Sequence, residues 1–227
     1  MESHAGTRAE MHLGLIAKKE RYGLTLRGWI ALVVFGVMAL GLGKAMLYPF
    51  LALNKPVGGD IMVAEGWLPD YALEIVVAEF QKGDYELLVT TGGDLAKGSY
   101  LSKYGNFADL TAATLIATGF DKEKIISIPS PKISKDRTYE TALRLQQWLH
   151  KNKPSIDAID IYSLGPHGRR TWLLFDLVLG GEIQVGVVSL EGRDYEADSW
   201  WRSSSGVRTM LNETIAYIYV RFFFYPH

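Results

Sequence analysis

The chain has 227 residues, with 24 lysine and arginine residues against 25 acidic residues, and it contains no cysteine. This balance provides no strong net field for binding nucleic acid or another polyanion. The lack of cysteine excludes disulfide scaffolds, thiolate nucleophiles and cysteine-based metal sites, although it is compatible with either side of a membrane.

The N-terminal part is a polar segment followed by a long apolar one. We expect residues 1–26 to form a cytoplasmic tail, because they are polar and of mixed charge. Between Trp29 and Leu53 the only charged residue is Lys44. A helix of roughly 20 apolar residues spans a bilayer, so residues 27–48 predict a transmembrane helix, and residues 27–53 an anchor with a short linker. A buried helix of a soluble domain and a cleaved signal peptide remain alternatives.

The distribution of charge predicts the orientation of this helix. Residues 1–28 carry five basic and three acidic residues, a net charge of +2, whereas residues 54–227 carry 18 basic and 22 acidic residues, a net charge of −4. Positive residues favour the cytoplasmic side. The sequence therefore predicts a single-pass protein of the inner (plasma) membrane, with a cytoplasmic N-terminus and residues 54–227 outside.

Residues 54–227 alternate strand patterns with helix patterns. The expected strands are Asp60–Ala64, Glu86–Thr91, Lys124–Ile128, Ala158–Ser163 and Ile183–Ser189. The expected helices are Asp70–Lys82, Lys103–Thr118, Arg137–Lys151, Pro166–Leu179 and about Ser205–Phe224. Continuous apolar strands joined by helices predict an α/β domain with a Rossmann-like, doubly wound and mostly parallel sheet of about five strands. Ligands bind at the carboxyl ends of the strands in such sheets.

The strand-to-helix turn at residues 163–170 provides the sharpest functional clue. His167 falls in the first helical turn, where free N–H groups favour an anionic ligand. Arg170 follows three residues later on the same side and should point toward the sheet. A guanidinium in that position needs a carboxylate or a phosphate-like ligand. We therefore expect Arg170 to contact an anion, with His167 as a donor or a general acid or base.

Other polar and glycine residues should converge on the same edge of the sheet. The candidates for ligand binding are Glu65, Gly66, Thr91, Gly92, Gly93 and Thr138. Glycine lets the backbone approach a ligand closely. Glu140 lies about one turn into a helix and could pair with Arg170 or act with His167 in catalysis. An ordinary tight turn, a solvated helix face and a structural histidine remain the alternatives for these residues.

Several motifs that would identify a cofactor or a reaction are absent. The sequence contains no G-x-G-x-x-G fingerprint, no Walker A motif, no H-E-x-x-H pair and no G-x-S-x-G elbow. A histidine-rich zinc site is therefore not expected, and the cofactor is unknown. In the C-terminal helix, an apolar stripe predicts core packing for the first three turns. Its members are Val207, Leu211, Ile215, Ile218 and Phe222.

Four short motifs in order resemble the YdcF-like family over about residues 59–190. They are Val63-Ala64-Glu65-Gly66, Thr91-Gly92-Gly93, Thr138-Tyr139-Glu140-Thr141 and His167-Gly168-Arg169-Arg170. The chain departs from the family in its Glu-Gly-Trp first turn and in Thr141, where the family has asparagine. It also departs near Phe107, where an acidic residue is expected and Asp109 is the nearest substitute. By this resemblance the departures imply a divergent branch of the family, and the predicted transmembrane helix before residue 59 resembles that of its membrane-anchored members.

The resemblance implies a Rossmann-like fold with a small-molecule pocket and, for anchored members, a role in the cell envelope. Our leading hypothesis is a membrane-anchored domain that binds a phosphorylated or nucleotide-like envelope metabolite, a small anionic ligand. One alternative is a hydrolase or transferase acting on envelope precursors through His167 and Glu140. The others are an S-adenosylmethionine-binding domain, as the resemblance suggests, and a non-catalytic scaffold.

Overall fold

The computed structural model describes residues 23–95, 103–132 and 135–226. The chain divides into two compact units, residues 1–42 and residues 43–227. The predicted cytoplasmic tail lies outside the described residues except for residues 23–26, so its conformation stays a prediction.

Helix α1 (Leu26–Leu51) is the long apolar helix expected near the N-terminus. Its most apolar window has a mean hydropathy of 2.2, and none of that window is buried. A core helix of a soluble domain would be mostly buried, so that alternative is wrong. By length and composition, α1 could be a membrane anchor or a signal sequence.

The sheet of the second unit has five strands, all parallel, in the order β3-β2-β1-β4-β5. The strands are β1 (Ile61–Glu65), β2 (Leu87–Gly92), β3 (Ile125–Pro129), β4 (Ala158–Leu164) and β5 (Gln184–Leu190). This arrangement confirms the predicted Rossmann-like α/β fold. Chain order reverses between β1 and β4, and ligands bind at such switch points in open parallel sheets.

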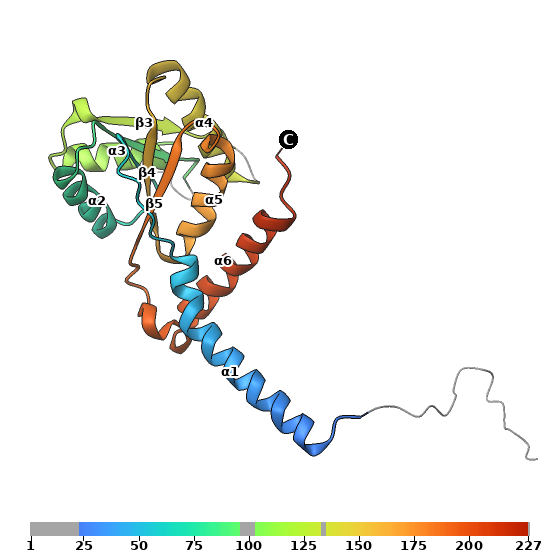
Figure 1. Cartoon of the computed structure of the whole chain (residues 1–227). Coiled ribbons are helices and arrows are strands. Elements are labelled where there is room, and N and C mark those ends of the chain that lie inside the picture. The colour runs from blue at the N-terminus through green and yellow to red at the C-terminus, as the bar shows by residue number, and fades with distance from the viewer. Residues whose placement is uncertain (1–22, 96–102, 133–134, 227) are drawn as a thin grey trace, which may run out of the picture. The chain divides into compact units, whose positions relative to one another are not determined.

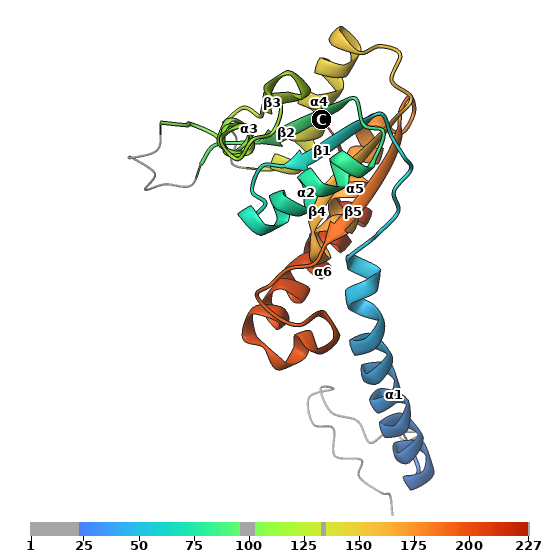
Figure 2. The same ribbon diagram turned by 90° about the vertical axis from the view of Figure 1, so that its left-hand side faces the viewer.

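Helices cover both faces of the sheet (Figures 1 and 2). The helices are α2 (Asp70–Lys82), α3 (Phe107–Ala117), α4 (Arg137–Asn152), α5 (Gly168–Leu179) and α6 (Ser204–Phe222), with short 3-10 turns η1 (Lys122–Lys124), η2 (Gly165–His167) and η3 (Ala197–Arg202). Apolar side chains of α2 and α3 pack in one core cluster, and those of α4 and α5 pack in another on the opposite face. Helix α3 begins four residues later than predicted, because Asn106 caps it by accepting from the Asp109 N–H at 2.8 Å.

The apolar stripe of α6 is exposed, so the prediction that it forms core in its first three turns is wrong. Leu211 and Ile215 are 55% and 66% exposed, whereas Gly206 and Met210 are the buried residues of this helix. The reason is that α6 packs through a different face. Gly206 allows the close approach there, since a Cβ atom would lie 2.3 Å from the Trp200 carbonyl oxygen.

The segment between α1 and β1 is fastened to the sheet by Asp160, a fully buried carboxylate in β4. Its side chain accepts hydrogen bonds from the backbone N–H groups of Val57 at 2.7 Å and Gly59 at 3.0 Å. The Tyr85 hydroxyl donates a third bond at 3.1 Å. A buried charge is tolerated when donors surround it in this way, so the linker is an integral part of the domain.

Candidate functional site

A cavity of about 810 Å³ lies at the carboxyl edge of the sheet. This volume is within the range of small-molecule and cofactor sites. Its walls come from the ends of β1, β2 and β4, from the start of α4 and from one face of α6. The cavity is therefore at the position expected for a doubly wound sheet. Most of the predicted site residues line it: Glu65, Thr91, Gly92, Gly93, Thr138, His167 and Arg170.

Glu65 ends β1 and forms the polar floor of this cavity, with only 6% of its surface exposed. The Ser163 hydroxyl donates to Oε2, and the Thr171 hydroxyl lies 3.3 Å from Oε1. His167 Nε2 is 3.7 Å from Oε1. Parallel pairing of β1 with β4 brings these residues together, because the carboxyl ends of neighbouring parallel strands meet at one edge.

His167 stands between two carboxylates. It is the last residue of η2, its Nδ1 lies 2.9 Å from Glu213 Oε1, and the Trp67 ring packs edge-on against it with centroids 4.9 Å apart. Nδ1 also lies 2.8 Å from an Nη atom of Arg170, but one nitrogen cannot donate and accept at once. Charge favours an Nδ1–H donating to the Glu213 carboxylate. The other ring nitrogen, Nε2, then lies 3.4 Å from an Nη atom of Arg170 and 3.7 Å from Glu65 Oε1.

Arg170 already has an internal carboxylate partner. Its Nε donates to Glu213 Oε2 at 2.9 Å and its Nη2 to Oε1 at 3.2 Å, so the pair is bidentate. The sequence analysis expected Arg170 to pair with either a carboxylate or a phosphate-like ligand, and in the structure it pairs with a carboxylate. Among the described residues Nη1 has no hydrogen-bonding partner. The guanidinium therefore lines the cavity with its charge neutralised but with donors still available.

Glu213 is the site residue that the sequence analysis missed. Burial alone would raise its pKa, but hydrogen bonds from His167 and Arg170, together with their charges, outweigh burial and lower the pKa to about 2. It lies on α6, which supplies one wall of the cavity through residues at helical spacing: Thr209, Glu213, Ala216 and Val220. The sequence contains this helical spacing, but another face of α6 carries a more apolar stripe, and the more apolar stripe was predicted to face the core.

The glycines of the two predicted turns have different roles. Gly66 does not line the cavity. A Cβ atom there would lie 2.4 Å from the Thr91 carbonyl oxygen, and the Gly66 N–H donates to that oxygen at 2.6 Å. Gly66 thus allows β1 and β2 to end close together. Gly92 and Gly93 do line the cavity, and Gly92 has a φ of 144°, a conformation that favours glycine.

The start of α4 faces the cavity through Asp136, Arg137, Thr138 and Tyr139. Asp136 has a left-handed conformation with a φ of 52°, and its side chain forms no capping hydrogen bond. The first N–H groups of this helix therefore have no side-chain cap from Asp136. Glu140, the next residue, is not among the cavity-lining residues, so the structure does not bring this candidate catalytic residue to His167.

The charged lining is more acidic than the sequence analysis expected. The acids are Glu65, Asp94, Asp136, Asp194 and Glu213, and the permanent cations are Arg137 and Arg170. Five carboxylates against two arginines give the lining an excess of hydrogen-bond acceptors over permanently charged donors. Within the described part of the chain, no group of His, Asp and Glu residues could hold a metal ion.

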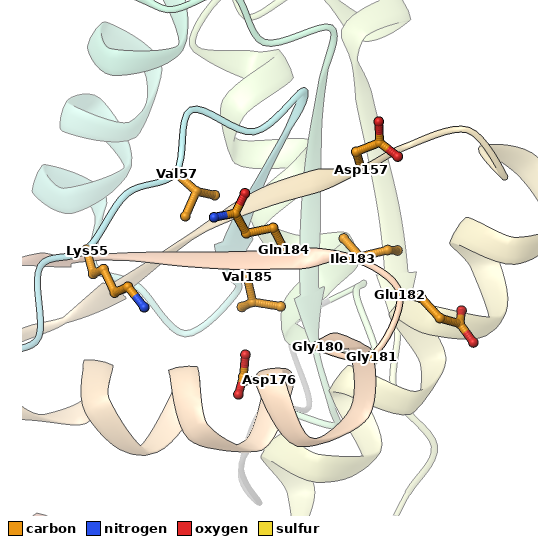
Figure 3. Close-up of a pocket in the computed structure, with 10 residues that line it drawn as sticks. All are labelled: Lys55, Val57, Asp157, Asp176, Gly180, Gly181, Glu182, Ile183, Gln184 and Val185. Carbon is orange, nitrogen blue, oxygen red and sulfur yellow. The ribbon is translucent and has the colours of Figure 1, made fainter.

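A smaller cavity of about 360 Å³ lies at the amino ends of β4 and β5 (Figure 3). Its charged residues are Lys55, Asp157, Asp176 and Glu182, which Figure 3 shows spread around the pocket rather than converging on one point. Parallel sheets bind ligands at the opposite edge, so the larger cavity is the candidate site.

The sequence matches no protein-family model, and no curated protein is significantly similar to it.

Proposed function

We propose that residues 43–227 bind a small polar metabolite, phosphorylated or nucleotide-like, in the cavity at the carboxyl edge of the sheet. One observation carries this proposal: a polar cluster and the start of α4 meet at one cavity of about 810 Å³. The cluster consists of the buried Glu65 and the half-buried His167, Arg170 and Glu213. A nucleotide-sized molecule fits this volume.

The mixed charges of the lining match a ligand with both an anionic group and hydroxyl groups. The start of α4, with Arg137 beside it, favours an anion through the helix dipole and through N–H groups that the Asp136 side chain does not cap. The remaining donors of Arg170 can bind the same group. Carboxylates such as Glu65 and Asp194 accept hydrogen bonds from sugar hydroxyls. A phosphate ester of a polyol or a nucleotide supplies both kinds of group.

The proposal includes an uncleaved membrane anchor with a cytoplasmic N-terminus and an extracytoplasmic domain in the cell envelope. Positive charge on the N-terminal side of α1 supports this orientation. The end of α1 also belongs to the domain: Leu51 is 1% exposed, and the Phe50 ring lies 5.3 Å from that of Tyr217. Removal of α1 as a signal peptide would remove this packing.

Membership of the YdcF-like family is part of the same proposal. It is supported by the motifs on which the resemblance rests, because most of their residues meet at the cavity. An outward-facing domain fits an envelope metabolite better than S-adenosylmethionine, which is not normally supplied there. Reporter fusions after Gly58 and at the C-terminus test the orientation, and a cytoplasmic signal from both would contradict the envelope role.

Ligand binding is tested with the detergent-purified full chain and a panel of nucleotides and sugar phosphates, using calorimetry. We expect Arg137→Ala and Arg170→Ala each to weaken binding about tenfold or more, because each loses a charge-assisted contact. Arg144→Ala is the matched control, since Arg144 lies on α4 outside the cavity and bonds to Gln147. Equal affinity in all three variants would exclude this site.

A second candidate function is general acid–base catalysis by His167. The favouring observation is that Glu213 bonds Nδ1 while Nε2 faces Glu65 across 3.7 Å, the arrangement of an oriented catalytic imidazole. In this version Glu213 is the orienting residue, in place of Glu140. Turnover of a phosphorylated envelope precursor that is lost in His167→Ala and retained in Glu140→Gln would favour it over simple binding.

A further inference from the structure

The 3-10 turn η3 places two tryptophans beside the end of α1, within the unit of residues 43–227. The Trp200 indole N–H donates to the Lys44 carbonyl oxygen at 3.2 Å, and the Lys44 Nζ lies 4.3 Å from the centroid of the Trp201 ring. The two indole rings pack edge-on with centroids 5.9 Å apart. Trp201 nevertheless stays 37% exposed, so its ring is not absorbed into the core.

Lys44 ends the uncharged stretch of α1, and apolar residues continue after it from Ala45 to Leu51. It is the first charged residue after Arg27. From Leu26 to Gly43 a helix extends about 27 Å at 1.5 Å per residue, which is close to the thickness of the bilayer hydrocarbon. If α1 spans the bilayer as proposed above, Lys44 and the rings around it lie in the headgroup layer. Tryptophan is enriched at that layer because its ring is apolar and its N–H is polar.

We propose that η3 is a second membrane contact, with Trp201 inserted at the boundary between lipid headgroups and acyl chains next to α1. The contact is aromatic rather than electrostatic, since the basic Lys44 and Arg202 are balanced by Glu196 and Asp198 in the same region. It rests on the proposed membrane anchor.

The η3 contact lies close to the candidate site within the unit of residues 43–227. Tyr195 lines the cavity and immediately precedes the residues that lead into η3. Its ring lies 6.4 Å from that of Tyr48, which is one helical turn beyond Lys44. One turn corresponds to about 6 Å along the helix axis. The wall of the cavity at Tyr195 is thus held close to the residues that follow Lys44 and to the η3 contact.

The lack of native cysteine allows a direct test with one label per variant. Asp198→Cys in η3 and Glu123→Cys in η1 are matched: both replace exposed acids in 3-10 turns. Each full-length variant is labelled with a fluorophore and reconstituted into phosphatidylcholine vesicles that carry a nitroxide on the lipid headgroup. We expect quenching at residue 198 to exceed that at residue 123 by about threefold or more, and to persist at high salt.

Adding Trp201→Ala to the Asp198→Cys variant should reduce the excess quenching by about half, because the indole is the inserted group. Alkaline extraction of the vesicles tests the anchor separately. If the protein resists extraction but quenching is equal at residues 198 and 123, the η3 contact is wrong and the anchor is retained. Extraction of the full chain by alkali would instead overturn the anchor, and the η3 contact with it. Quenching that vanishes in high salt would overturn the aromatic mechanism.

Discussion

Replacing Glu213 with glutamine tests the central interaction of the candidate site. The carboxylate accepts from His167 and from two nitrogens of Arg170, and only 15% of its side chain is exposed. Glutamine has nearly the same shape as glutamate, but it replaces one of the two carboxylate oxygens with an NH₂ group. That group cannot accept a hydrogen bond from the donors of His167 and Arg170. We therefore expect the folded state to be destabilised without a change of fold.

The lowered pKa of Glu213 sets the size of this effect. A shift from 4.5 to about 2 corresponds to about 3 kcal/mol of unfolding free energy, at 1.36 kcal/mol per pKa unit. Because the folded pKa is lower than the unfolded one, this stabilisation is present above pH 4.5 and is lost as the pH falls toward 2. The difference between the wild type and Glu213→Gln should be about 3 kcal/mol at pH 7 and about 1 kcal/mol at pH 3.

Urea unfolding of the detergent-purified full chain, followed by tryptophan fluorescence, measures this difference at both pH values. The matched control is Glu182→Gln, because Glu182 also pairs with a histidine, His150, but at the surface. We expect that control to change stability by less than about 1 kcal/mol. A loss in Glu213→Gln no larger than in the control, or of equal size at pH 3 and pH 7, would refute the role given to Glu213.

Three further substitutions test other parts of the structure. Asp160→Ala leaves its two backbone donors and the Tyr85 hydroxyl without their acceptor. We therefore expect urea unfolding to show that the unfolding free energy falls by about 3 kcal/mol or more, and a fall of less than about 1 kcal/mol would contradict this role of Asp160. Gly66→Ala should lower the unfolding free energy by about 2 kcal/mol, because the new Cβ atom would collide with the Thr91 carbonyl oxygen. A Tm equal to that of the wild type would disprove this close approach of Gly66 to Thr91. Ile215→Ser should change unfolding free energy by less than about 0.5 kcal/mol, since Ile215 is 66% exposed, and a large loss would mean that this face is covered.

Local patterns in the sequence predicted the fold, which the structure confirms, and directed attention to one edge of the sheet for the candidate site. Continuous apolar runs predicted the five strands, and the boundaries of α2 agree with the helix expected from residue 70 to residue 82. The uncharged stretch before Lys44 predicted a helix long enough to cross a membrane. His167 and Arg170 were found because they follow one strand directly, and residues that end parallel strands meet at one edge of a sheet.

Only the tertiary structure decided the partners of these residues. Glu213 lies 43 residues after Arg170 in the chain, and Glu65 lies 98 residues before Ser163, so no local pattern relates them. The face of α6 that packs carries the buried Gly206 and Met210 together with Glu213, which meets the partly buried guanidinium of Arg170. Periodicity shows how a helix divides its polar and apolar faces, but which face packs in a domain depends on neighbours that are distant in the sequence.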